Sequence, residues 1–146
     1  MNTTPLTPLA LAASLVGLPW QAGAAGPQAF NCWGLVRHWC RLVLAVQMPD
    51  VPTATPDDAR AHIAAAAQAG GWRPLADGTA PAQHDIALLR NPLNGQRHVG
   101  VLLQANGALN LLHCEGSEAN PWPGVVCEPL AQALCRYHGL QLWRRA

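Results

Sequence analysis

Apolar residues between positions 31 and 49 recur at three- and four-residue steps, which is the spacing of one face of an α-helix. Asn31 is a natural N-cap for this segment, and it places Cys32 at the first helical position. The helix is expected to end near Gln47 to Pro49. The apolar positions that define it are Leu35, Val36, Trp39, Cys40, Val43 and Leu44.

Two other segments carry the start and stop residues of helices. Thr7 caps a short helix that begins at Pro8 and stops at Gly17. Thr55 caps an alanine-rich helix that begins at Pro56 and stops at the glycine pair 70–71. These three helices occupy the first half of the chain.

The second half has the character of an antiparallel sheet followed by a short helix. The pair Asn106-Gly107 lies between two apolar runs and is a strong hairpin signal. Helices followed by strands predict an α+β fold, and the length favours one domain over residues 1–146. The expected elements are strands at Asp85–Arg90, His98–Gln104, Ala108–Cys114 and Leu140–Arg145, and a helix from Pro129 to about Arg136.

The N-terminal segment also has some features of a secretory signal, because an apolar run precedes the small-residue stretch "QAGAAG". The first basic residue is Arg37, however, and the run is too short to cross a bilayer. We therefore expect no signal peptide and no membrane partner, with the chain made in the cytoplasm.

Charge and cysteine content narrow the class of protein. Charged residues make up 12% of the chain and the formal net charge is +1, which argues against a nucleic-acid partner. The five cysteines form no CxxC pair, so a reducing compartment is the simpler interpretation. Most free cysteines are small buried hydrophobes, and only position can mark one as reactive.

Cys32 has such a position, because a thiol at the start of a helix lies at the positive end of the helix dipole. Its predicted base is His98, which begins a strand, and His113 lies on the next strand. If Asn106 and Gly107 form a two-residue loop, His113 falls one diagonal step from His98 on the same face of the sheet. A three-residue loop would put Cys114 there instead. The thiol pKa is expected to be lowered by the helix and by imidazolium at His98.

Two other interpretations of these residues remain. The histidines could occupy strand ends by chance, satisfied by backbone and water. Cys32, His98, His113 and Cys114 could in principle bind zinc, but none of these ligands forms a pair at the short spacing usual in zinc sites. We therefore expect no metal and no cofactor.

Four short blocks stand in order along the chain: "LPWQAGAAGPQAFNCWGLVR" (18–37), "HDIALL" (84–89), "HVGVLL" (98–103) and "LLHC" (111–114). Together they are similar to the NlpC-type cysteine peptidases, and most of all to the subgroup encoded with phage and prophage tail-assembly genes. The resemblance implies a papain-like α+β fold, with the nucleophile at a helix N-terminus packed on an antiparallel sheet. It also implies hydrolysis of amide bonds in peptidoglycan stem peptides, commonly between D-glutamate and a diamino acid.

The resemblance also assigns roles to residues. Cys32 matches the nucleophile of the family, His98 its general base and His113 its third, polar residue. Trp20 stands where many members have a tyrosine near the oxyanion and substrate side. Asn31 replaces the usual aspartate, which in some members holds the free amine of the substrate, and an amide brings no negative charge to that site.

The same resemblance suggests the partners, which are the peptidoglycan stem peptide and phage tail proteins, with the chain carried in a virion tail. A second hypothesis is a catalytically weak structural component of a phage tail tip. A third is acyl transfer by the same thiol chemistry.

Overall fold

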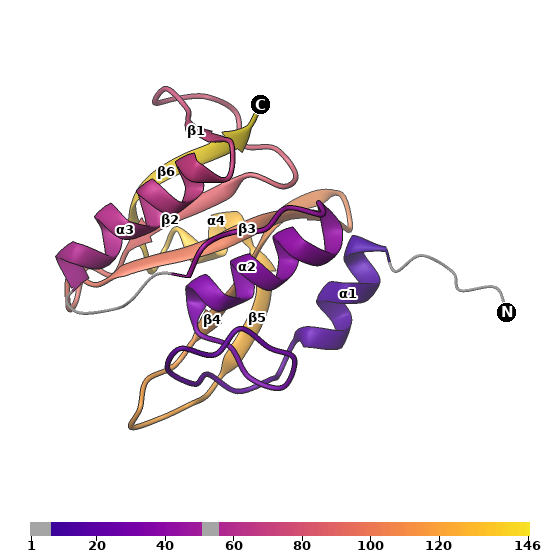
Figure 1. Cartoon of the computed structure of the whole chain (residues 1–146), viewed down its shortest axis with the longest axis vertical. Helices are drawn as coiled ribbons and strands as arrows, with labels where there is room; N and C mark the ends of the chain where they lie inside the picture. Colours follow the sequence, from indigo (N-terminus) through magenta and orange to yellow (C-terminus); the bar gives the residue numbers. More distant parts are fainter. Residues whose placement is uncertain (1–6, 51–55) are drawn as a thin grey trace, which may run out of the picture.

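The structure is a computed structural model that describes residues 7–50 and 56–146. Three helices come first and strands dominate the rest of the described chain, as the sequence predicts (Figure 1). The elements are α1 (Pro8–Leu15), α2 (Cys32–Val43), α3 (Pro56–Ala69), β1 (Trp72–Pro74), β2 (Ile86–Arg90), β3 (Arg97–Ala105), β4 (Ala108–Glu115), β5 (Gly124–Pro129), α4 (Leu130–Ala133) and β6 (His138–Arg145).

The strands form one antiparallel sheet in the order β1-β6-β2-β3-β4-β5. The β3–β4 hairpin turns at Asn106 and Gly107, and Ala105 pairs with Ala108. Both turn residues have positive φ, 53° and 76°, which is the backbone that a two-residue type I′ turn requires. The predicted two-residue loop is therefore confirmed.

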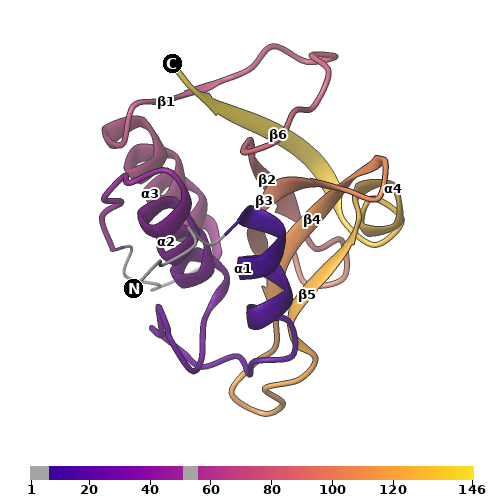
Figure 2. The ribbon, with the colours of Figure 1, turned by 90° about the vertical axis from the view of Figure 1, so that its right-hand side faces the viewer.

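Both faces of this sheet are covered (Figure 2). Helices α1, α2 and α3 pack on one face, where Val99, Val101 and Leu103 of β3 enter the larger core. Helix α4 lies on the other face, where Leu102 packs with Leu130 in a second, smaller core. Burial on two faces explains why β3 reads as a continuous apolar run and does not alternate.

The helices begin and end for local reasons. Thr7 Oγ1 accepts a hydrogen bond from the N–H of Ala10 at 3.1 Å, as expected of the N-cap of α1. Helix α2 stops at Val43, before the predicted end, because Ala45 adopts a left-handed φ of 55° and the N–H of Val46 returns to the carbonyl of Cys40. The predicted cap Thr55 lies outside the described residues.

Two strands were not predicted. β1 has three residues and pairs only with β6, while β5 is an edge strand that pairs with β4. Both strands lie at the edges of the sheet, and pairing with a neighbouring strand defines them more than their local sequence does. The predicted helix after Pro129 is present but ends at Ala133.

Asp85, in the block "HDIALL", has a structural contact. Its side chain is 1% exposed and accepts hydrogen bonds from Arg144 Nε at 2.7 Å and Nη2 at 2.8 Å. This bidentate pair joins the entrance of β2 to the end of β6, at the opposite end of the chain.

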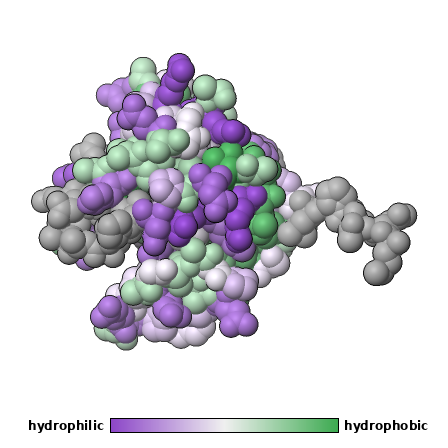
Figure 3. All heavy atoms as spheres, in the orientation of Figure 1, coloured by the Kyte–Doolittle hydropathy of each residue, from purple (hydrophilic) through white to green (hydrophobic). Residues whose placement is uncertain are grey.

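The outer surface is mixed. Figure 3 shows apolar surface over α1 and the adjoining end of α2, where Leu9 and Leu42 are exposed. Among the helices of the described residues, none has both the length and the apolar character needed to cross a bilayer.

Candidate active site

The start of α2 is built around Asn31 and Cys32. Asn31 Oδ1 accepts a hydrogen bond from the N–H of Gly34 at 2.6 Å, so Asn31 is the N-cap that the sequence predicts. The N–H of Asn31 donates to the carbonyl of Ala24 at 2.9 Å. That carbonyl lies against Gly34, where a Cβ would collide with it. Gly34 therefore lets the loop before α2 close over the first turn of the helix.

The thiol of Cys32 is not a resting thiolate. Burial raises the pKa of Cys32, and the nearby backbone N–H groups of Val99, Trp33 and Cys32 itself oppose that rise only in part. The expectation of a lowered thiol pKa is therefore wrong. The helix start supplies favourable N–H groups, but desolvation outweighs them.

The two histidines meet as the hairpin register requires. Gly100 of β3 pairs with His113 of β4, which puts His98 one diagonal step from His113. His98 Nε2 lies 2.7 Å from His113 Nδ1, and both side chains are buried. The contact that the two-residue loop predicts is present, and Cys114 does not take the place of His113.

A carboxylate that the sequence did not single out continues this pair. Glu128 Oε2 lies 2.6 Å from His113 Nε2, and Glu128 is 5% exposed. Arg136 donates to both oxygens of Glu128, from Nη1 at 2.6 Å and Nη2 at 2.8 Å. The Arg136 guanidinium and the bond from His113 lower the pKa of Glu128 to about 2, so this buried acid is ionised.

Tyr137 completes the surroundings of His98. Its ring stacks on the imidazole of His98 with centroids 4.8 Å apart and an interplanar angle of 8°. Burial is the main reason that the pKa of His98 falls to about 3, and the positive charge of Arg136 adds to it. Burial also lowers the pKa of His113. Both imidazoles are therefore neutral at pH 7.

Cys32 and His98 lie in the wall of one cavity of about 490 Å³. The cavity opens where β3 begins and β4 ends, and no hydrogen bond joins the thiol to the imidazole in the part of the chain that the structure describes. Catalytic contacts often tighten only when substrate binds. The wall contains Trp20, Asn31, Cys32, Asn91, Asn94, Gln96, Arg97, His98, Cys114, Glu115, Ser117, Glu118 and Tyr137, with three small residues.

The other cysteines on these elements are packed. Cys40 is completely buried in the larger core, as expected. Cys114 is 1% exposed, and its Sγ donates to the carbonyl of Phe30 at 3.2 Å. Burial raises the pKa of Cys114 to about 12, which is poor for a metal ligand at neutral pH.

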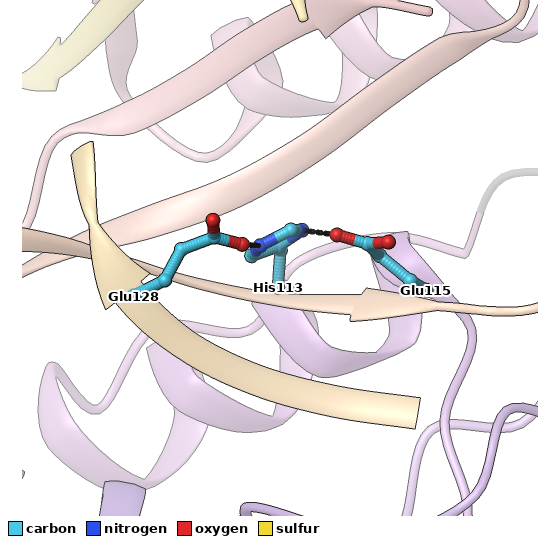
Figure 4. A group of neighbouring side chains, drawn as sticks. All are labelled: His113, Glu115 and Glu128. Atoms are coloured by element: carbon cyan, nitrogen blue, oxygen red, sulfur yellow. Dashed lines mark hydrogen bonds and ion pairs between the residues drawn. The ribbon is translucent and has the colours of Figure 1, made fainter. Parts of the chain in front are cut away.

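His113, Glu115 and Glu128 form a cluster whose donor atoms lie within 4.8 Å of one another. Figure 4 shows the two carboxylates on opposite sides of the His113 ring, each facing a different ring nitrogen. Arg136 Nη2 already donates to both, to Glu115 Oε1 at 2.5 Å and to Glu128 Oε2 at 2.8 Å. A guanidinium thus bridges the two carboxylates where a cation would have to bind.

Comparison with solved structures identifies the fold. The chain is similar to NlpC1 from Trichomonas vaginalis (TM-score 0.57, 21% identity, 92% of this chain) and spans 41% of that protein. It also matches the NlpC/p60 domain of the peptidoglycan hydrolase SagA (TM-score 0.54, 19% identity, 92% and 93% of the two chains). A third match is an N-acetylmuramoyl-L-alanine amidase from Bacteroides uniformis (TM-score 0.53, 14% identity, 93% and 96%).

The comparisons with family models and with curated proteins matched nothing. The antiparallel sheet, the helix that begins at Cys32 and these structural matches define an α+β, papain-like fold. More particularly, it is the fold of NlpC/p60 domains.

Proposed function

We propose that this chain is a cysteine peptidase that hydrolyses amide bonds in peptidoglycan stem peptides. The observation that carries the proposal is the bond of 2.7 Å between His98 Nε2 and His113 Nδ1, beside a cavity that Cys32 also lines. A nucleophile, a base and a group that orients the base are the parts that thiol-dependent acyl transfer needs. The fold shared with a peptidoglycan hydrolase domain supports peptidoglycan as the substrate.

The reaction begins from a neutral thiol and a neutral imidazole. Cys32 Sγ attacks the scissile carbonyl carbon while its proton passes to His98 Nδ1. The backbone N–H of Cys32 stabilises the oxyanion, a contribution of about 3 kcal/mol for one donor. The C–N bond then breaks, and His98 returns the proton to the leaving amine.

The second half of the reaction releases the enzyme. His98 accepts a proton from a water molecule that attacks the thioester, and the C–S bond breaks as the proton returns to Cys32. The products are a free carboxylic acid and the intact thiol. His113 accepts the hydrogen bond from His98 Nε2 throughout the reaction. This bond keeps Nδ1 of His98 available for proton transfer.

Substrate recognition is proposed at Trp20 and Asn31, which both line the cavity. The oxygen of Asn31 accepts from the N–H of Gly34, and the side-chain amide of Asn31 brings no charge to the cavity wall. A D-glutamyl–diamino acid bond within a stem peptide is therefore the proposed target, without a requirement for a free amine on the substrate. This part rests on the sequence resemblance.

The place of action is also proposed from the sequence blocks, which are most similar to peptidases of phage tail-assembly gene clusters. The chain would then reach peptidoglycan with the virion tail or after lysis. The raised pKa of Cys32 favours one competing function, a catalytically weak component of a tail tip. Measured turnover of peptidoglycan distinguishes the peptidase from the catalytically weak component.

The experiment is digestion of purified peptidoglycan, with the products identified by mass. Wild type should release stem-peptide fragments, and Cys32→Ala should release none. Cys135→Ala is the matched control, because Cys135 is an exposed cysteine that is not part of the cavity wall, and it should cleave as wild type does. Folded wild type that releases nothing, or Cys32→Ala that cleaves, would refute the proposal.

A further inference from the structure

His113 lies between two carboxylates that compete for its single proton. Glu128 Oε2 is 2.6 Å from Nε2, and Glu115 Oε1 is 3.5 Å from Nδ1 on the other side of the ring (Figure 4). A neutral imidazole carries one N–H, and the nitrogen that carries it is set by the stronger acceptor. The shorter contact and the 5% exposure of Glu128 favour protonation at Nε2.

The tautomer of His113 determines the tautomer of His98. When His113 Nε2 holds the proton, Nδ1 is a lone pair, and it can only accept from His98 Nε2 at 2.7 Å. His98 then carries its proton on Nε2 and leaves Nδ1 bare. Only this tautomer of His98 can accept a proton from Cys32 at Nδ1.

We propose that Glu128 is a positioning residue that fixes the tautomers of both histidines, with Arg136 holding its carboxylate in place. Arg136 donates to both Glu128 oxygens and to Glu115 Oε1, so the acid cannot rotate away from His113 without breaking two charged hydrogen bonds. A chain of hydrogen bonds therefore runs from Arg136 through Glu128 and His113 to His98. The effect of this arrangement on catalysis rests on the proposed function, whereas the predicted tautomers do not depend on it.

Removal of Glu128 should reverse both tautomers. In Glu128→Met, His113 Nε2–H would face no acceptor and would lie beside the Arg136 guanidinium, which favours a lone pair there. The proton then moves to Nδ1, where Glu115 and His98 accept it. His98 must in turn accept at Nε2 and hold its own proton on Nδ1, so it can no longer take a proton from Cys32.

The test is a long-range ¹H–¹⁵N correlation spectrum of the histidine rings at pH 7, assigned with His98→Gln and His113→Gln. In wild type, both rings should show protonated Nε2 and bare Nδ1. Glu128→Met should show protonated Nδ1 in both. Glu115→Gln is the matched control, because it removes the competing carboxylate and should keep the wild-type tautomers.

Two results would overturn the proposal: protonated Nδ1 at either histidine in wild type, or unchanged tautomers in folded Glu128→Met. If Glu128→Met does not fold, the wild-type spectrum still decides, and Glu128→Gln, which retains an acceptor oxygen, should keep Nε2 protonated. With a stem peptide that wild type cleaves, Glu128→Met should lower kcat roughly 10²- to 10⁴-fold with little change in KM. If wild type shows the predicted tautomers but cleaves no substrate, the proposed function is refuted and the tautomer proposal stands.

Discussion

Acid should destabilise this protein through His98 before most carboxylates titrate. The unfolded chain binds a proton at His98 below about pH 6.5, whereas burial holds the pKa of the folded group at about 3. Above about pH 6.5, His98 is neutral in both the folded and the unfolded state, so it does not affect the free energy of unfolding. Between pH 6.5 and 3 the unfolded state binds more protons than the folded state, so the free energy of unfolding falls as the pH falls.

The size of the effect follows from the two pKa values. One group with this shift changes the free energy of unfolding by up to about 1.4 kcal/mol per pH unit. Between pH 7 and pH 5 the loss from His98 alone is about 1.9 kcal/mol. His113 adds a loss of the same sign, because burial also lowers its pKa.

The assay is urea unfolding followed by tryptophan fluorescence at pH 7, 6 and 5, on wild type and His98→Gln. Glutamine can still donate to His113 Nδ1 but does not titrate, and groups that do not interact with His98 contribute equally to both proteins and cancel. Wild type should lose about 1.9 kcal/mol more than the variant between pH 7 and 5. Parallel pH dependences would refute the neutral, buried state of His98 on which the mechanism depends.

Three further outcomes are expected. Gly34→Ala should lower the free energy of unfolding by about 1–2 kcal/mol in urea, because the new methyl group meets the Ala24 carbonyl; a more stable variant would contradict the packing described. His84→Gly should raise the free energy of unfolding by up to about 1 kcal/mol, because His84 has a φ of 74° and a buried Nδ1 without a partner among the described residues; a loss would contradict this. Alkylation of Cys32, followed by peptide mass mapping, should still accelerate above pH 9, because the thiol pKa is raised; a plateau from neutral pH would indicate a resting thiolate.

Local signals were sufficient to predict the parts of the site that are close in sequence. Asn31 marks the start of α2, and Asn106-Gly107 determines the loop, so the contact between His98 and His113 follows from turn geometry. Helical and strand periodicity likewise predicted the core elements and the α+β class.

The rest depends on pairing between distant segments. Glu128 lies on β5, an edge strand that begins at Gly124 and ends at Pro129, and its pairing with β4 brings it beside His113. Arg136 and Tyr137 approach the histidines because the chain turns between α4 and β6. The pKa of Cys32 was misjudged for the same reason, because burial comes from the assembled fold and the helix dipole is local.

The central claim is that Cys32 forms the acyl-enzyme, and the most direct measurement is the intact mass of the protein during reaction with a defined stem tetrapeptide. Rapid acid quench should reveal wild type carrying the acyl fragment of the cleaved peptide, mapped to Cys32, while Cys32→Ala carries none and releases no product. Cleavage by Cys32→Ala, or an acyl group mapped to another residue, would contradict the account.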